Sequence, residues 1–528
     1  MLHSRDWNHL IFKVQVAFMT RIVKIHVVDE AGLVELRRER DGIVLERLAE
    51  PDRFEIEDGP LAEYERSLGV QETGSEFRVE ETFTYRAGIP YWGAAFHYPL
   101  KWAILRGARF DGRQPKWAPP HRLDRRAAII LASLAVVSLL GGFLSNTQGE
   151  MLTYAAEEFG KSTSEQGLSS AVTRAGTVLA LGAAFVADRR GRRLVLGVSM
   201  VAGIVSAAMI AIAPSFAVLT VLMTLTRMFN SALGASAFLL AMEEMPAGAR
   251  AFCLALLAMP AGLGAGMVVW VEPVADQSPT AWRYVFAVPL LLLPFVFGVL
   301  KRLPESRRFI ARTTSVKLRP YMPRIALLGS ILFLIDIFLA PIDQFRNEYL
   351  RDEHGFSASQ VSLLILSTAT PGSIALLFWG RIADTVGRRI VIGFACVVGL
   401  GAAVLFFNVT EVLLYPLGFL SVLLSVGLLS SVGVYRAELF PTNIRAKAGA
   451  IVSIIGVSGS AVGLIAMGRL VDRWGSFGPV VALFWIGPLL ALIIVVVGLR
   501  ETSRHELEDL NPEDLRPEHV EPEDLQAT

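Results

Sequence analysis

The chain has 528 residues, of which 53% are hydrophobic and only 19% are charged, and its mean hydropathy is +0.48. This balance exceeds what one soluble core would use, so the lipid bilayer is the predicted solvent for most of the chain. The formal net charge of +1 leaves no general excess of positive charge, and nucleic acid is not an expected partner.

The sequence shows none of the motifs that carry enzyme chemistry. Cys253 and Cys396 both fall in apolar stretches, which indicates small buried hydrophobic residues rather than a disulfide. The eight histidines are scattered without metal-ligand spacing, and no nucleophile or phosphate-binding glycine motif stands in its required context. We therefore expect no enzyme activity, no metal and no cofactor.

Residues 1–125 predict a small cytoplasmic α+β domain. Short alternating runs between Gly, Asp and Pro signals indicate strands at 22–28, 33–37, 43–48, 54–57 and 77–85. The aromatic segment 89–105 is expected to pack on that sheet or to lie along the inner leaflet. Strands followed by such a segment resemble a START-like helix-grip fold, and the alternative is a passive appendage. Charges such as Arg5 and Lys13 speak against a signal peptide, and Met19 is an alternative start.

Twelve apolar runs follow, each about as long as a helix that crosses a 30 Å hydrocarbon layer. Helices are predicted because lipid offers no hydrogen-bond partners, and a helix pairs its backbone N–H and C=O groups within its own segment. The predicted helices are 127–149, 168–187, 194–213, 216–240, 251–271, 283–300, 325–345, 359–379, 390–408, 412–435, 447–467 and 480–498.

One sequence motif occurs twice, first as Ala184-x-x-x-Asp188-x-x-Gly191-Arg192-Arg193 and then as Gly380-x-x-x-Asp384-x-x-Gly387-Arg388-Arg389. Each copy is followed by Glu-x-x-Pro-x-x-x-Arg, at Glu243 to Arg250 and at Glu438 to Arg445. The offsets are 384 − 188 = 196 and 438 − 243 = 195 residues. Two long apolar halves therefore carry the same pattern, which is typical of a transporter with an internal repeat.

Lysine and arginine concentrate in the junctions after the even-numbered helices. The odd-numbered junctions hold few, chiefly Lys161, Arg346, Arg351, Arg469 and Arg473. Positive residues stay on the cytoplasmic side, so both ends of the chain are expected inside a cell, in a multi-pass plasma membrane protein.

Residues 127–510 resemble the major facilitator superfamily, because several motifs agree in order. The doubled loops lie between helices 2 and 3 and between helices 8 and 9, as that family requires. Its sugar and metabolite symporter branch is suggested by four further segments: 282–283, 304–308, 435–442 and 500–508. The resemblance implies a fold of twelve transmembrane helices in two six-helix pseudo-symmetric bundles, and alternating-access transport.

Two departures from that branch limit what the resemblance implies. The Gln-Gln and Asn signature of sugar porters is missing from 335–344, which argues against a hexose substrate. The segment 140–144 looks like the stretch before the Asp of proton-linked sugar carriers, but the matching position is Gln148. Proton coupling therefore cannot be carried over from that position.

The doubled loops predict a conformational latch. A carboxylate at Asp188 or Asp384 can accept hydrogen bonds from a helix N-terminus and pair with arginine on a neighbouring helix. The resemblance implies that these charges hold the cytoplasmic ends together when the cavity faces outward. The alternative is a signal that only sets topology. The predicted latch residues are Asp188, Arg192, Glu243, Arg250, Asp384, Arg388, Glu438 and Arg445.

Ionisable or polar residues inside apolar helices are the candidates for the substrate or proton pathway, because such groups usually face a cavity. Asp336 and Arg174 are predicted at a similar depth, and a structural ion pair is the alternative. Glu150 is assigned equally to the cavity or to the outer interface. The full set is Asn146, Gln148, Glu150, Arg174, Arg227 and Asp336.

We therefore expect a secondary active transporter of a small organic solute, a metabolite or organic acid, with proton-coupled symport. The alternatives are a proton-driven exporter and a membrane-anchored ligand sensor that works through residues 1–125. The expected domains are a soluble cytoplasmic α+β domain at 1–125, a six-helix transport bundle at 126–300 and a second one at 325–500. A cytoplasmic linker at 301–324 joins the bundles, and an acidic tail at 501–528 is expected to be disordered.

Overall fold

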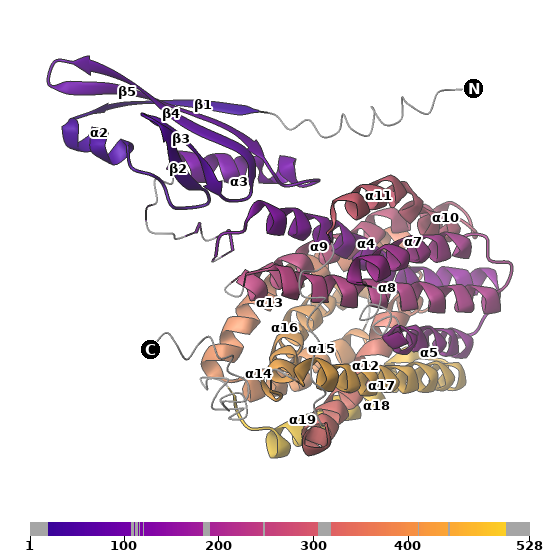
Figure 1. The fold of residues 1–528 in the computed structure, drawn as a ribbon. Helices are drawn as coiled ribbons and strands as arrows, with labels where there is room; N and C mark the ends of the chain where they lie inside the picture. The colour runs from indigo at the N-terminus through magenta and orange to yellow at the C-terminus, as the bar shows by residue number, and fades with distance from the viewer. Residues whose placement is uncertain are drawn as a thin grey trace, which may run out of the picture.

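The computed structural model describes residues 19–106, 110, 114–115, 117–119, 121–182, 191–246, 249–304, 318–409, 411–441 and 444–502. An N-terminal unit, residues 20–106, holds a five-stranded sheet and two helices, and the rest of the described chain is helical (Figure 1). This unit lies beside one end of the helices, which we call the proximal end. The opposite end, where the first long helix finishes, is the distal end.

The N-terminal unit is an antiparallel sheet with strand order β1-β5-β4-β3-β2. The strands are β1 (Thr20–Val28), β2 (Leu45–Glu50), β3 (Arg53–Asp58), β4 (Leu61–Thr73) and β5 (Glu76–Ala87). Burial alternates along β5, where Val79, Phe83 and Tyr85 are buried. Helices α2 (Glu30–Leu36) and α3 (Gly93–Arg106) pack against this face through Leu33, and through Leu100 and Ile104.

Two expectations for this unit were wrong. Residues 33–37 fall largely in helix α2 rather than in a strand, because Asp29 caps the helix by accepting from the backbone N–H of Gly32 at 2.8 Å. Strand β4, the longest, was missed because its inward positions include a charge. Arg66, fully buried there, breaks the expected alternation of apolar and polar residues.

Arg66 belongs to a buried ionic network on the inner face of the sheet. Its guanidinium contacts Glu46 at 2.6 Å and Glu81 at 3.3 Å. Arg40 pairs with Glu81 at 2.5 Å, and the hydroxyl of Tyr64 donates to Glu46 at 2.5 Å. Burial, with the Glu46 carboxylate adding to it, raises the pKa of Tyr64. Each buried charge thus has an opposite charge and further hydrogen bonds, which such groups require to remain ionised.

The first six helical segments are α4 (Arg125–Glu158), α5 (Thr163–Leu179), α7 (Arg192–Ile210), α8 (Phe216–Glu244), α9 (Arg250–Val271) with η2 (Glu272–Gln277), and the broken rod α10 (Trp282–Ala287), η3 (Val288–Leu292) and α11 (Leu293–Arg302). The next six are α12 (Met322–Asp352), preceded by η5 (Arg319–Tyr321), α13 (Ala358–Val386), α14 (Arg388–Phe394) with η6 (Ala395–Gly399) and α15 (Leu400–Phe406), α16 (Glu411–Glu438), α17 (Arg445–Trp474), and α18 (Phe477–Phe484) with α19 (Ile486–Gly498).

These segments lie where the sequence predicted membrane helices, with ends that differ by several residues. Within the described ranges, ten are long and apolar enough to cross a membrane. Helix α4 continues to Glu158 instead of ending near residue 149, and α12 continues to Asp352 instead of ending near residue 345. The extra two turns of α12 carry Arg346, Asn347 and Glu348, which are polar and therefore fell outside an apolar run.

The backbone repeats the duplication seen in the sequence. Gly191 and Gly387 both have positive φ, 100° and 126°, and each stands directly before a helix. Only glycine adopts such angles without strain, which explains its place in both motifs. Capping boxes begin α5 at Ser162 with Glu165, and α13 at Ser357 with Gln360. Their offset of 195 residues, 357 − 162, equals that of the second sequence motif.

The N-terminal unit is attached to the helices through its aromatic segment. The indole N–H of Trp92 donates to the carbonyl of Ala132 in α4 at 3.1 Å. The ring of Tyr91 lies 6.5 Å from that of Phe295 in α11, and the guanidinium of Arg302 sits over it. A Cβ at Gly298 would approach the Tyr91 hydroxyl to 2.8 Å, so glycine makes room for this contact. The unit therefore docks on the first helical half.

Replacing Arg66 by methionine should destabilise the N-terminal unit by about 3 to 5 kcal/mol, because Glu46 and Glu81 would lose their shared buried cation. Hydrogen exchange of strands β4 and β5 in the full-length protein measures the loss of protection. Arg53→Met is the matched control, since its pair with Glu65 is exposed and should matter little. Equal protection in the two variants would contradict the structural role of the network.

Candidate functional site

A cluster of buried polar side chains joins the two helical halves at the distal end. Glu150 of α4 accepts from the amide of Asn347 in α12 at 2.6 Å and contacts Arg346 at 3.3 Å. Beside it, the amide of Gln344 donates to the carbonyl of Gly149 at 3.1 Å. The structure thus places Glu150 at the contact between the halves near their distal end.

Glu272 completes this distal cluster and is fully buried. It begins η2, directly after α9, and accepts from the hydroxyl of Tyr154 at 3.2 Å. From the second half, Ser362 donates to it at 3.0 Å and Asn347 at 3.3 Å. Asn347 therefore donates to two carboxylates at once. Groups of this kind are costly to bury, so they hold the two halves together only while all partners are in place.

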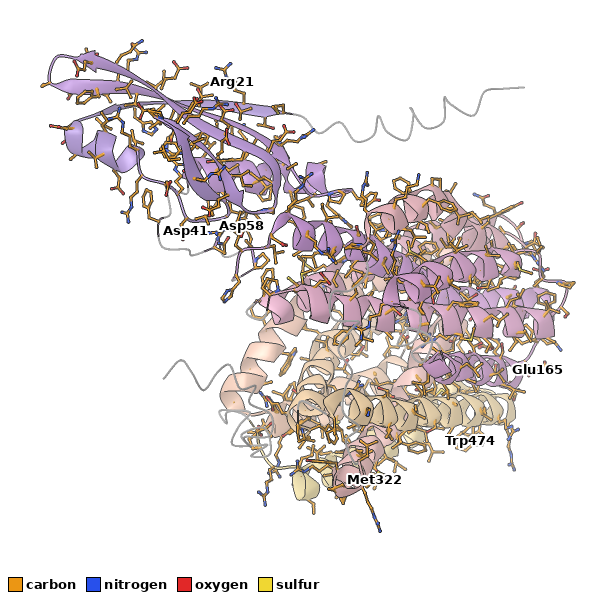
Figure 2. The ribbon with its side chains drawn as sticks, viewed as in Figure 1. Arg21, Asp41, Asp58, Glu165, Met322 and Trp474 are labelled. Atoms are coloured by element: carbon orange, nitrogen blue, oxygen red, sulfur yellow. The ribbon has the colours of Figure 1, made fainter. Side chains whose placement is uncertain are left out.

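Further hydrogen bonds between the halves surround the cluster. Thr163 donates to Glu348 at 2.6 Å, and the N–H of Ser164 donates to Asp472 at 3.0 Å. Asp276 caps the first turn of α13, accepting from the N–H groups of Ala358 and Ser359 at 2.9 and 3.2 Å. Figure 2 shows Glu165 and Trp474, one from each half, at this same end. The distal end is therefore closed by contacts between the halves.

Asp336 lies deeper, near the middle of α12. Arg174 of α5 and Arg436 of α16 are its electrostatic neighbours. A Cβ at Gly456 would come within 2.8 Å of its carboxylate, so α17 passes directly beside it. Arg174 and Asp336 come from opposite halves and interact electrostatically. No direct ion pair between these two described side chains is present.

Arg227 adds a second guanidinium on the first half. It interacts electrostatically with Arg174, and its Nε lies 3.5 Å from the hydroxyl of Thr177. Arg174 and Arg227 each stand eleven residues after the first residue of their helices, so both lie about 16 Å from the distal helix ends. Arg174 and Arg436 interact electrostatically with Asp336, and Asp343 of α12 is a second acid that acts on Arg174.

Asn146 and Gln148 have another environment. The amide of Asn146 donates to the carbonyl of Ala265 in α9 at 3.1 Å, and that of Gln148 to the carbonyl of Met223 in α8 at 2.9 Å. Both partners belong to the first half. These amides therefore tie neighbouring helices together, and the sequence did not anticipate this use.

The second copy of the doubled motif forms an ion pair at the proximal end. The guanidinium of Arg388 pairs with Glu438 and donates to the hydroxyl of Thr502 at 2.7 Å. Glu501 accepts from the backbone N–H groups of Arg388 and Arg389, both at 3.0 Å, and so caps α14. The side chains of Asp384 and Arg445 lie outside the described residues.

Only part of the first copy can be placed. Arg192 begins α7, whereas Asp188 and the side chains of Glu243 and Arg250 lie outside the described residues. The adjacent acid, Glu244, pairs with Arg126 of α4 at 3.2 Å.

Sequence reasoning missed several residues of these sites. Glu272 follows the apolar run 251–271 by one position, and Arg346 to Glu348 follow 325–345, so all stood just outside predicted spans. Arg436 was quoted within a motif but given no role. Glu501 follows the last helix, and its position at the start of α14 depends on tertiary structure. Glu272 and the segment from Arg346 to Glu348 could have been recognised as polar residues that directly follow an apolar run at the same end of both halves.

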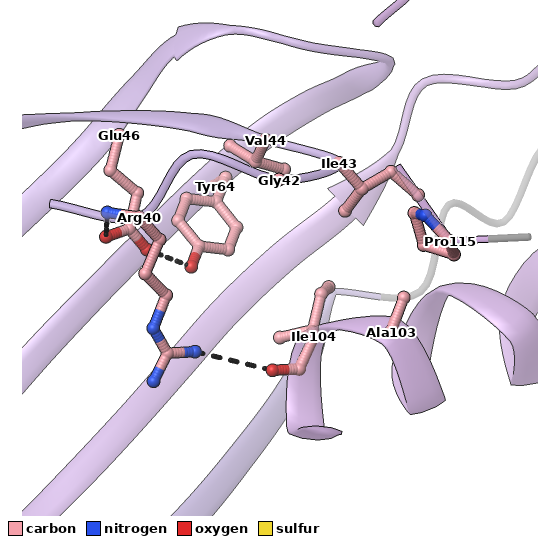
Figure 3. A pocket seen from close by; sticks show the side chains of 9 residues that line it. All are labelled: Arg40, Gly42, Ile43, Val44, Glu46, Tyr64, Ala103, Ile104 and Pro115. Carbon is pink, nitrogen blue, oxygen red and sulfur yellow. Dashed lines mark hydrogen bonds between the residues drawn. The ribbon is translucent and has the colours of Figure 1, made fainter. Parts of the chain in front are cut away.

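The N-terminal unit offers little room for a ligand between its sheet and α3. The cavity there has a volume of about 30 Å³ and is lined by residues such as Arg40, Tyr64 and Ile104 (Figure 3). That is enough for about one or two water molecules. Across the described ranges, no group of His, Cys, Asp or Glu side chains could hold a metal ion.

Residues 326–525 match the family model described as Major Facilitator Superfamily. No curated protein matches the sequence. Among solved structures, a mutant of the nucleoside transporter NupG matches with 13% identity and a TM-score of 0.60, over 70% of this chain and 100% of that one.

Two further structures are similar. The xylose transporter XylE from E. coli, in an inward open conformation, has 16% identity and a TM-score of 0.57, over 72% of this chain and 99% of that one. A bacterial homologue of the human lysosomal transporter Spinster, inward-facing and unoccupied, has 13% identity and a TM-score of 0.56, over 70% of this chain and 95% of that one. Residues 326–525 thus match the Major Facilitator Superfamily model, and the helices share the fold of these transporters, which makes the chain a multi-pass membrane protein.

Replacing Glu501 by alanine should destabilise the first turn of α14 by about 1 kcal/mol, because two backbone N–H groups lose their acceptor. Hydrogen exchange of residues 388–394 measures this effect. Arg500→Ala, a change at the exposed neighbouring residue, serves as the control. Unchanged exchange in Glu501→Ala would show that solvent replaces the cap.

Proposed function

We propose that this chain is a secondary active transporter that moves a small organic acid together with a proton by alternating access. Its twelve helical segments would form two pseudo-symmetric bundles of six, with the solute bound between them. The observation that carries the proposal is the excess of guanidinium groups inside the helices. Among the described side chains, Arg174, Arg227 and Arg436 outnumber the two acids that act on them, Asp336 and Asp343, in a region where unpaired charge is costly.

An anionic solute would balance this charge. Guanidinium groups bind carboxylates through paired hydrogen bonds, and this geometry selects a planar anion over a neutral sugar. The absence of the sugar-porter signature from 335–344 supports the same choice. Arg174 and Arg227 come from the first half and Arg436 from the second, so a bound anion would contact both.

Alternating access requires the distal contacts to form and break. In the described conformation Asn347, Ser362 and Thr163 link the halves there, which favours a state closed on that side. Several of the similar structures are inward-facing or inward open. We assign the distal side to the outside, and propose that the Arg388–Glu438 pair belongs to a cytoplasmic latch that engages the first half in the opposite state.

Proton coupling needs a carboxylate whose surroundings change as the halves move. Asp336 and Glu150 both meet this condition, because their neighbours come from opposite halves. When the halves separate, Glu150 would lose Asn347 and Arg346, and Asp336 would lose Arg174. Removing a cation or a donor favours proton uptake by a carboxylate, so the movement itself can drive the proton on and off.

Uptake of radiolabelled metabolites into vesicles, with and without a proton gradient, tests the function. A mono- or dicarboxylate should accumulate when the outside is acidic, and neutral sugars and nucleosides should not. Accumulation only in inverted vesicles would indicate an exporter. No transport of any anion would overturn the assignment to organic acids.

Asp336→Asn should abolish accumulation driven by the proton gradient while solute exchange continues, because exchange needs no net proton movement. Glu150→Gln should do the same if it is the coupling acid. Glu165→Gln is the matched control, since Gln360 already performs the same capping role in the second half. If both interior variants still accumulate solute against its gradient, neither acid couples transport.

Topology can be tested by cysteine labelling, because the native Cys253 and Cys396 are buried. A cysteine at Ser278, on the distal side, should react with an impermeant reagent in intact cells. One at Ser75, in the hairpin of the N-terminal unit, should react only after permeabilisation. The reverse pattern would place the N-terminal unit outside the cell.

A further inference from the structure

A second cavity, far larger than that of the N-terminal unit, lies between this unit and the helices. Its volume is about 460 Å³, within the range of about 300 to 1,000 Å³ typical of sites for small organic ligands. Phe96 and Leu100 of α3 and Trp117 of the following segment form one wall. Ala132 of α4 and Leu257 and Leu263 of α9 form the other.

The position of this cavity corresponds to the hydrocarbon layer next to the N-terminal unit. Ala132 is seven residues into α4 and Leu263 thirteen into α9, so these residues lie about 10 and 20 Å along their helices. Met259 and Leu263, which also line the cavity, are 70% and 44% exposed. The helical wall thus continues onto the outer surface of the helices, which faces lipid in a multi-pass membrane protein.

Polar groups are confined to a few points in this cavity. Gln114, His121 and Arg122 contribute to the lining from the segment that leads into α4, and Arg122 is held by Asp41. The indole N–H of Trp117 is buried and has no hydrogen-bond partner among the described residues. The rest of the lining is almost entirely apolar. An occupant that fits has a long apolar part and at least one acceptor oxygen.

Helix α3 has the properties of a segment that meets a membrane surface. Tyr98 and Trp102 are 76% and 52% exposed, although their rings are large and amphipathic. Such rings concentrate where headgroups meet hydrocarbon. The cavity beneath α3 therefore begins at the depth of the glycerol esters and continues toward the acyl chains.

We propose that this cavity binds an acyl chain of a phospholipid from the adjoining leaflet, with an ester carbonyl accepting from Trp117. The lipid would fill the space between the N-terminal unit and the first helical half. Because the lining residues come from α3, α4 and α9 together, the lipid would hold the unit against the membrane. This site is distinct from Arg174, Arg227 and Asp336.

A phosphatidylcholine with a diazirine in one acyl chain tests the proposal in nanodiscs of the full-length protein. Crosslinks are expected in the peptides that contain Phe96, Ala132 and Leu257. Ala132→Phe should reduce them severalfold by filling the cavity. Val497→Phe is the control, because it adds the same kind of bulk at a residue that is 83% exposed on α19.

Thermal unfolding in the same nanodiscs shows which variants remain folded. If Ala132→Phe unfolds, Leu257→Phe fills the cavity from α9 instead. Crosslinking that is confined to exposed helix faces, or that a folded cavity-filling variant leaves unchanged, would overturn the proposal. Loss of the crosslinks on adding a transported carboxylate would also overturn it, because the cavity would then belong to the transport path.

Discussion

Hydrocarbon offers no hydrogen-bond partners, and the arrangement of polar groups in this molecule follows from that constraint. Backbone groups satisfy it inside helices, but a side-chain charge or a helix end must find a partner on another element. Glu272 finds three side chains on two halves, and Asp276 caps a helix of the opposite half. The surfaces where the halves meet are consequently where ionisable groups collect, and movement of one half against the other must change their surroundings.

The same constraint explains why duplication is more faithful at the helix ends than within the helices. Gly160 and Gly355 both have positive φ, at 61° and 66°, and each precedes a capping box 195 residues from its counterpart. A helix end needs the same backbone geometry in both halves. Interior side chains are free to diverge, as Asp336 of the second half does by interacting with Arg174 of the first.

Much of the fold could be predicted from the sequence, because length and hydropathy decide where a helix crosses a membrane. The ends of α12 were misjudged for a physical reason. Arg346 to Glu348 are polar, but the facing half provides their partners, and no local pattern records that. The site was predicted only in part, because some of its residues acquire their partners only in the folded structure. Asp336 and Arg174 stood out as charges in apolar runs, whereas Glu272 and Glu501 gain their roles only through tertiary contacts.

Glu501 also has a consequence for the order of assembly. The residue that caps α14 is separated from it by 113 positions, beyond the last membrane helix. During synthesis the first turn of α14 must therefore enter the membrane with its N–H groups uncapped by protein, and it gains its acceptor only after α19 has emerged. Completion of this helix thus waits for the residues that follow α19. A ribosome that stops before residue 501 leaves an otherwise finished second half with one helix start exposed to water.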